Sequence, residues 1–476
     1  MRLILKLIAL TLAAMCVAFT GAASADLRVD WMRGFSAPGT PAKYDQVGVI
    51  KIGPQRAKNV LVLEPGTSAG SAYFVPLAQW LVSQTTGWQV WSVERRENLL
   101  EDQSELDLAK AGKASATQLF DYYLGWIANP AITRHFQLIP NASVGFAKQW
   151  GMNVAVEDLH QVIEAAGKLG GQVVLGGHSL GGAVVTAYAT WNFNGRPGAD
   201  DLAGLVYIDG GSRPAVSAPQ AAAALRKLDG AGSSPWLSFG GIGAPYAGLF
   251  EATGSTAALI DPNAPNLEQA SGLLPADLVP PVPVTNLGQY GYALNVTTSP
   301  MALAAAQAHL GQGIATTGNP RGWNGLGALT PIDRFATMFS GFGVQDADGS
   351  EWYFPERLTL DTGAVDNGNA NPAQRVLQVK ATLGRKLPKD LLIYAFGARL
   401  GGQGVLTDAI RLAKQSHIPL HNLTLINRQS TYAHNDPAGA YPRNVFFAHL
   451  VPFLDSVSRA HSHSRRRDAR PVRPHA

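Results

Sequence analysis

The residues best suited to chemistry in this sequence are a serine and the glycines around it. The letters Gly-His-Ser-Leu-Gly at 177–181 place Ser179 directly after the apolar run 173–175 and before the small-residue stretch 181–189. A Gly-x-Ser-x-Gly turn of this kind is too tight for larger side chains on either side of the serine. The serine then has strained backbone geometry and an exposed hydroxyl. A glycine-rich surface turn gives the same letters, but the strand before it and the helix after it favour a nucleophile.

Strands and helices that could position this serine alternate along the chain. Apolar, β-branched runs predict strands, and apolar spacing near 3.6 residues predicts helices between them. Uninterrupted apolar strands separated by helices indicate a mostly parallel sheet covered on both faces, an α/β fold. We expect strands at 47–52, 59–66, 87–95, 172–177, 202–211, 390–398 and 423–429, and helices at 73–84, 154–169, 405–416 and 444–457.

The alternation breaks in one long segment. Residues 213–388 are rich in glycine, proline and isolated aromatics, and the alternation returns after them. We therefore expect one α/β core, 26–212 and 389–458, interrupted by a cap or lid insertion at 213–388. Because the insertion follows a strand that ends beside the serine turn, it should cover Ser179. Its aromatic residues, the run 352–354 among them, are expected either to line an apolar pocket or to form the insertion's own core.

In the serine turn and the order of elements around it, the chain resembles the α/β-hydrolase superfamily. The resemblance covers about residues 45–212 and 389–457. It implies an α/β-hydrolase fold, with a mostly parallel central sheet and helices on both faces. A serine at the turn excludes the relatives that attack through aspartate, such as epoxide hydrolases and haloalkane dehalogenases. The sequence contains no His-Glu-x-x-His motif, P-loop or dinucleotide fingerprint, so no metal and no cofactor is expected.

A serine hydroxyl becomes a good nucleophile when a histidine takes its proton and a carboxylate orients that histidine. The resemblance places the histidine after the last strand, where His434 stands. It usually places the acid after the penultimate strand, but residues 391–404 contain no Asp or Glu. Some lipases carry the acid at the end of the preceding strand, so we favour Asp209. Asp408 and Asp436 remain as alternatives.

Two backbone N–H groups are expected to bind the negative oxygen formed during attack on a carbonyl. The geometry of the serine turn makes the amide of Leu180 one of them. The resemblance implies a second donor in the glycine-led turn at 66–68, and we choose the Thr67 amide. Glu64 and Pro65 stand where a histidine-glycine pair is common in the superfamily, which leaves the donor within this loop open.

The N-terminus has the pattern of an export signal. Arg2 and Lys6 precede an apolar stretch that closes on the small residues 23–25. We expect residues 1–25 to be a cleaved signal peptide and the protein to be secreted or periplasmic. The only cysteine, Cys16, lies inside this segment, so the mature chain is expected to have no disulfide and no thiol chemistry.

The basic residues are concentrated at the two ends of the chain. The whole chain has 38 basic and 34 acidic residues. Setting aside the two basic residues of 1–25, and the six arginines and one aspartate of 459–476, leaves 30 basic and 33 acidic residues. The slightly acidic body argues against a nucleic-acid partner, and the tail 459–476 is expected to be a disordered arm.

These observations together predict an exported serine hydrolase that cleaves carboxylic esters through an acyl-enzyme intermediate. Its substrate would be a small-molecule or polymeric acyl ester, with no stable membrane span. A peptidase or polyester depolymerase of the same fold is an alternative, although the sequence shows no basic or acidic subsite for peptide termini. A non-catalytic scaffold that binds a ligand under its cap is a further alternative, suggested by the empty acid position. The sequence does not indicate an oligomeric state.

Overall fold

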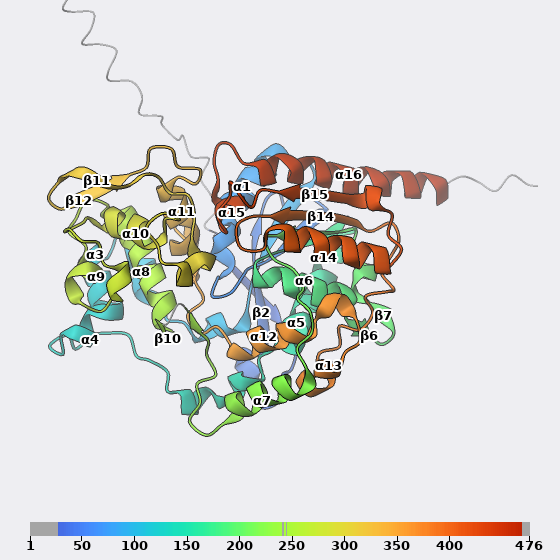
Figure 1. Ribbon diagram of the computed structural model, residues 1–476, viewed down its shortest axis with the longest axis horizontal. Coiled ribbons are helices and arrows are strands. Elements are labelled where there is room, and N and C mark those ends of the chain that lie inside the picture. Colours follow the sequence, from blue (N-terminus) through green and yellow to red (C-terminus); the bar gives the residue numbers. More distant parts are fainter. Residues whose placement is uncertain (1–26, 240–241, 244, 469–476) are drawn as a thin grey trace, which may run out of the picture.

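The centre of the molecule is a nine-stranded, mostly parallel sheet with helices on both faces, as predicted (Figure 1). The computed structural model describes residues 27–239, 242–243 and 245–468, so the expected signal peptide lies outside the described residues. The strand order is β13-β1-β2-β4-β3-β5-β8-β14-β15. From β4 to β15 neighbouring strands are parallel, whereas β2 is antiparallel to both β1 and β4. The strands are β1 (Leu27–Arg33), β2 (Gln46–Ile52), β3 (Asn59–Glu64), β4 (Trp88–Glu94), β5 (Val173–His178), β8 (Gly204–Ile208), β13 (Val344–Gln345), β14 (Leu392–Gly397) and β15 (Leu423–Asn427).

Alternate residues of the central strands pack into two different cores. On β3, Val60 and Val62 join the apolar core that contains α5 (Met152–Gly167), α6 (Leu180–Thr190) and α14 (Gly402–Gln415). Leu61 and Leu63 point to the other face and pack with α1 (Val75–Gln84) and α16 (Val445–Asp468). A strand that buries both faces must be apolar without interruption. This is why the central strands could be recognised in the sequence.

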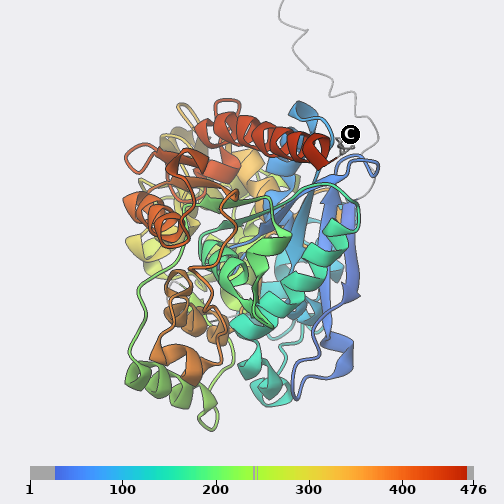
Figure 2. The ribbon, with the colours of Figure 1, turned by 90° about the vertical axis from the view of Figure 1, so that its right-hand side faces the viewer.

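The segment expected to be one cap occupies two places. Its middle part forms α8, α9, α10, α11, β11 and β12, which lie to one side of the sheet with the short helices α3 and α4 (Figure 1), and α2 packs against α8. Its two ends lie at the core: β13 pairs with β1 at the sheet edge, and α12 and α13 pack with α7, the first helix of the insertion. In both views α7, α12 and α13 lie at the opposite end of the molecule from α16 (Figure 2). The bounds are α2 (Ser104–Lys110), α3 (Ala116–Phe120), α4 (Trp126–Ala128), α7 (Ala218–Asp229), α8 (Tyr246–Ile260), α9 (Leu267–Ser271), α10 (Asn286–Leu294), β11 (Gly313–Gly318), β12 (Arg321–Asn324), α11 (Ile332–Ser340), α12 (Glu356–Asp361) and α13 (Pro372–Leu377).

The reason for this division is the apolar content of the insertion's last part. Phe354, Leu358 and Leu377 are fully buried and belong to the same core as α5 and α6. Burying such side chains is worth about 2 kcal/mol each, so this stretch packs against the sheet helices. The remaining short elements are β6 (Asn192–Phe193), β7 (Arg196–Pro197), β9 (Ser238–Phe239), β10 (Ile242–Gly243) and α15 (Asp436–Gly439).

The C-terminal helix is longer than the sequence analysis predicted. Helix α16 continues to Asp468, ten residues into the segment expected to be a disordered arm. No glycine or proline interrupts residues 453–468, so nothing in the local sequence ends the helix earlier. Residues 469–476 lie outside the described part of the chain. Within that part, none of the helices combines the length and the apolar character needed to cross a bilayer.

Candidate active site

Ser179 stands alone between β5 and α6 in a strained backbone conformation. Its φ of 56° and ψ of −124° lie in a region that non-glycine residues rarely adopt. The neighbouring glycines are required by close approach. A Cβ on Gly177 would lie 2.3 Å from the Gly181 carbonyl oxygen, and one on Gly181 would lie 2.3 Å from the Glu64 carbonyl oxygen. The Gly-x-Ser-x-Gly spacing therefore has the steric cause that the sequence analysis gave it.

The serine turn packs directly against the end of β8. The Ser179 amide donates a 3.0 Å hydrogen bond to the Ile208 carbonyl. A Cβ on Gly210 would lie 1.8 Å from the Ser179 carbonyl oxygen, so only glycine fits there. Between them, Asp209 has a φ of 47°, a second non-glycine residue in the left-handed region. Two strained residues side by side at the carboxyl edge of a parallel sheet are typical of a functional site.

His434 and Asp209 form a buried pair. The His434 Nδ1 lies 2.6 Å from the Asp209 Oδ2, and the two side chains are 1% and 0% exposed. The other ring nitrogen, Nε2, is buried and has no hydrogen-bond partner among the described residues. Both His434 and Ser179 line the same cavity. An aspartate on Nδ1 fixes the tautomer whose Nε2 is a free acceptor, which is the form that can accept a proton.

A loop of backbone amides, residues 398–402, surrounds the Asp209 carboxylate, and we call it the acid cradle. Oδ1 accepts hydrogen bonds from the amides of Ala398 (2.6 Å), Gly401 (2.9 Å) and Gly402 (3.1 Å). Oδ2 accepts one from the Leu400 amide at 3.1 Å. Burial by itself raises the pKa of Asp209, but hydrogen bonds from His434 and the cradle outweigh it, so this pKa lies below its ordinary value. The acid is thus ionised.

The acid cradle is the loop after the penultimate strand, where the resemblance described above led us to look first for the acid itself. Here that loop supplies donors to an acid on the neighbouring strand. The sequence analysis missed this role. Two features of the sequence could have indicated it: the absence of a carboxylate from this loop, and the Gly401-Gly402 pair. The glycines let the loop backbone approach the Asp209 carboxylate, since a Cβ on Gly401 would lie 2.9 Å from the Asp209 Oδ1.

The two alternative acids have hydrogen-bond partners other than the His434 side chain. Asp408 is partly exposed on α14 and pairs with Arg411 at 3.3 Å. Asp436 is buried and accepts from His309 Nδ1 (2.5 Å) and from the Thr330 hydroxyl (2.7 Å). It also accepts from a backbone amide of its own loop. The structure therefore brings Asp209 to His434, while Asp436 ties the histidine loop to the insertion.

His178 contacts both the backbone and the ring of His434. Its Nε2–H donates a 3.0 Å hydrogen bond to the carbonyl of His434. Its ring stacks on Tyr73, with ring centroids 5.2 Å apart. Burial, together with the neighbouring His434, lowers the pKa of His178 to about 3. The ring therefore stays neutral at ordinary pH and serves as a fixed hydrogen-bond donor.

The expected oxyanion loop lies against the serine. A Cβ on Gly66 would lie 2.9 Å from the Ser179 Cβ, and the next residues, Thr67 and Ser68, line the cavity. Ser68 has a φ of 52°, so the loop is strained. The amides of Thr67 and Leu180 form no hydrogen bond with another described residue, which leaves both available to a ligand oxygen.

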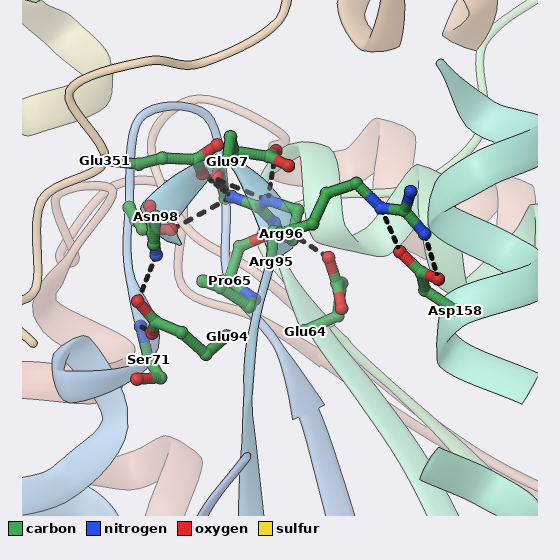
Figure 3. A network of polar contacts seen from close by, with 12 residues as sticks. Glu64, Pro65, Ser71, Glu94, Arg95, Arg96, Glu97, Asn98, Asp158 and Glu351 are labelled. Atoms are coloured by element: carbon green, nitrogen blue, oxygen red, sulfur yellow. Dashed lines mark hydrogen bonds and ion pairs between the residues drawn. The ribbon is translucent and has the colours of Figure 1, made fainter. Parts of the chain in front are cut away.

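Arg95, just after β4, holds this loop in place (Figure 3). Its guanidinium donates to the carbonyls of Pro65 (3.1 Å), Gly66 (2.9 Å) and Ala69 (2.9 Å). Buried carboxylates surround it: Glu64 lies 2.7 Å away, Glu97 lies 3.4 Å away, and Glu351 also pairs with it. Burial disfavours the charge on Arg95, but these carboxylates raise its pKa, so it remains a cation.

The cavity above Ser179 lies between the sheet edge and the insertion. It contains about 1020 Å³ of space, counting its open mouth. Its walls are mostly apolar and come from α8, α10 and α11, with Phe250 and Phe339 among them. The aromatic run 352–354 is buried in the protein cores instead. Two carboxyl side chains, Glu251 and Glu268, also line the cavity.

The two carboxyls in the cavity change an argument made from the sequence, which found no acidic subsite for a peptide terminus. In sequence, Glu251 and Glu268 look like ordinary glutamates on helices. Only the packing of α8, α9 and α10 places them inside a cavity.

In the described ranges there is no group of three or more His, Cys, Asp or Glu residues arranged to hold a metal ion.

One comparison with known proteins identifies a family that this chain matches. A family model described as "Alpha/beta hydrolase family" matches residues 61–326. A search of curated proteins found no match. Similar solved structures include a candidate lipase from Sulfolobus solfataricus, with 14% identity and a TM-score of 0.43, covering 90% of this chain and 93% of that one. A carboxyl esterase from Bacillus coagulans has 11% identity and a TM-score of 0.39, with 91% and 99% covered. A monoglyceride lipase variant from Saccharomyces cerevisiae has 10% identity and a TM-score of 0.37, with 90% and 94% covered.

Proposed function

Because this chain belongs to the alpha/beta hydrolase family, we propose that it is a serine hydrolase that cleaves carboxylic esters through an acyl-enzyme intermediate. Ser179 is the nucleophile, His434 the general base and acid, and Asp209 the orienting acid. The amides of Leu180 and Thr67 bind the oxyanion. The substrate is a small-molecule or polymeric acyl ester whose apolar part occupies the cavity.

The observation that carries this proposal is the state of the two nitrogens of His434. Nδ1 is bound to Asp209, while Nε2 is buried without a partner in the wall of the cavity that Ser179 also lines. A general base needs a free lone pair on Nε2, because that is where the serine proton goes.

The proposed reaction follows from this arrangement. Ser179 Oγ attacks the ester carbonyl carbon as its proton moves to His434 Nε2, and Asp209 stabilises the imidazolium. The carbonyl oxygen becomes an oxyanion held by two amides. The C–O bond to the alcohol then breaks, and the leaving oxygen takes the proton from Nε2. Water attacks the acyl-enzyme by the same steps, which releases the acid and restores Ser179.

A covalent probe tests the nucleophile directly. Purified protein, residues 26–476, is treated with a fluorophosphonate, and the adduct is mapped by mass spectrometry. We expect a single adduct on Ser179, none on Ser179→Ala, and none on denatured protein. An unlabelled folded protein would contradict the hydrolase proposal and favour a scaffold that binds a ligand without turnover. A panel of ester and aminoacyl substrates then separates esterase from peptidase and from polyester depolymerase.

We also propose that the protein is exported, on the basis of the N-terminal pattern alone. Expression of the full chain followed by N-terminal sequencing of the exported product should give Asp26 as the first residue. Retention of Met1 in the mature protein would contradict this.

A further inference from the structure

The cap side of the cavity carries a polar group of side chains in an otherwise apolar wall. Glu251 comes from α8, Glu268 from α9, and Gln289 and Tyr290 from α10, and all four line the cavity. Glu268 is 7% exposed and Gln289 is 2% exposed. Ser179 lines the same cavity from the sheet side. A ligand that reaches both sides would therefore have its reactive bond at Ser179 and another group at these side chains.

The unsatisfied atoms in this group are hydrogen-bond acceptors. Among the described residues, Glu268 Oε1 and Gln289 Oε1 have no hydrogen-bond partner. The Gln289 amide nitrogen is already used, since it donates to the Leu278 carbonyl at 2.9 Å. The Tyr290 hydroxyl is also used, since it donates to Glu251 Oε1 at 2.9 Å. When both carboxyls are ionised, the site therefore lacks donors, which a ligand would have to supply.

The ionisable side chains of the cavity also favour a ligand that donates hydrogen bonds. The lining residues include two carboxyls but neither lysine nor arginine. The α8 backbone makes room for one of the carboxyls: a Cβ on Gly254 would lie only 3.3 Å from the Glu268 Oε2. Once ionised, a carboxyl placed deep in a cavity without a cation from its own chain has a charge that a cationic ligand would balance.

We infer that this group of side chains, which we call the cap carboxyl site, binds a protonated amine of the substrate while the ester lies at Ser179. The inference rests on the proposed function, which it makes more specific. The substrate class is an ester whose acyl or alcohol part ends in an ammonium group beyond an apolar chain. A hydroxyl group would supply one donor but no charge.

The protonation of the two carboxyls makes the site sensitive to pH. Burial, with the neighbouring Glu251, raises the pKa of Glu268 to about 8. Burial raises the pKa of Glu251 to about 7, with the Tyr290 hydrogen bond opposing and Asp348 adding to the rise. Both carboxyls are protonated at pH 6 and both are largely ionised at pH 9. Because an ammonium prefers the ionised carboxylates, its affinity should rise between these two pH values, whereas that of an uncharged ligand should not.

The test measures binding without turnover. Ser179→Ala protein is titrated by calorimetry with n-butyl-, n-hexyl- and n-octylammonium, and with the alcohols of the same lengths, at pH 6 and pH 9. We expect one of the ammonium ions to bind at least about tenfold more tightly than its alcohol at pH 9, a difference of about 1.4 kcal/mol. The advantage should shrink at pH 6.

Variants locate the effect. In the Ser179→Ala background, Glu268→Gln keeps the shape of the side chain and removes its charge, and it should abolish the preference for ammonium while leaving alcohol binding unchanged. Glu251→Gln should weaken the same preference and serves if the first variant fails to fold. The matched control is Glu164→Gln, which makes the same change on the exposed face of α5 and should alter neither ligand's affinity.

Two results would overturn the inference. Equal binding of ammonium ions and alcohols at pH 9 would mean that the carboxyls do not recognise a cation. Tighter binding of an alcohol that is lost in Glu268→Gln would make the site a hydroxyl site. Since no arm of the test involves hydrolysis, failure here is distinct from failure of the fluorophosphonate experiment.

Discussion

Asparagine in place of Asp209 would disable the site by a mechanism that the acid cradle dictates. Oδ1 accepts three backbone N–H bonds, whereas Oδ2 accepts from His434 Nδ1 and from the Leu400 amide. An asparagine has one carbonyl oxygen, and the three donors at Oδ1 decide that this oxygen lies there. Its NH₂ group must then face His434. Nδ1 can accept that hydrogen bond only when the ring proton sits on Nε2, where it blocks proton transfer from Ser179.

The magnitudes follow from the same geometry. A histidine held in the wrong tautomer lowers kcat by about 10³–10⁴-fold, which corresponds to about 4–5 kcal/mol in the activation barrier. The NH₂ group also faces the Leu400 amide, and two donors opposed in a buried site cost about 1–3 kcal/mol of unfolding free energy. Asp209→Asn should therefore be folded, less stable and almost inactive.

Three measurements separate this mechanism from simple damage. They are kcat with 4-nitrophenyl butyrate, the rate of fluorophosphonate labelling, and the unfolding free energy from urea denaturation. The matched control, Asp408→Asn, removes a charge that pairs with Arg411 on α14 and should leave all three near the wild-type values. The reasoning would be refuted if Asp209→Asn kept more than about a tenth of the activity, or if Asp408→Asn lost as much.

Three further outcomes are expected. Gly66→Ala places a Cβ 2.9 Å from the Ser179 Cβ. By distorting the oxyanion loop, it should slow fluorophosphonate labelling at least about tenfold. The control Gly145→Ala, whose Cβ meets nothing within 4 Å, should be labelled at the wild-type rate. Arg95→Lys keeps the charge but not the fork that binds three carbonyls, so kcat should fall by about 10²-fold with KM nearly unchanged; an unchanged kcat would show that the loop holds itself. In the folded protein Glu268 keeps its proton to about pH 8, whereas in the unfolded chain it loses it at about pH 4.3. The unfolding free energy should therefore fall as pH rises between these two values. Glu268→Gln should flatten this pH dependence in urea titrations, and an unaltered slope would contradict the raised pKa.

The parts of the site that the sequence could predict are those with a local steric or chemical cause. The turn around Ser179 requires glycine two residues before and two residues after the serine, so its whole signature lies within five consecutive residues. A strand buried on both faces must be apolar throughout. His434 followed from the resemblance, which places the histidine after the last strand. Asp209 was favoured because the usual acid position is empty, and the structure now gives it the hydrogen bond to His434 that this role requires.

The parts that the sequence could not predict depend on packing between distant segments. Arg95 lies about thirty residues from the loop whose carbonyls it binds, and nothing in its own neighbourhood indicates that it is buried. Glu251 and Glu268 occupy helices in which exposed glutamates are common, and only the arrangement of three helices turns them inward. The return of Phe354 and Leu358 to the main core was hidden because a long insertion gives no periodic signal of which layer it joins.

The hydrogen bonds around Asp436 limit how this protein could be redesigned. His309 and Thr330, both from the insertion, bind a carboxylate two residues from His434, and the end of the same insertion packs in the same core as α5 and α6. A cassette exchange, in which residues 213–388 are cut out and replaced by the cap of a relative, would remove the anchor of the histidine loop along with the cavity walls. New specificities are therefore more accessible by point changes on α8, α9 and α10 than by transplanting whole caps.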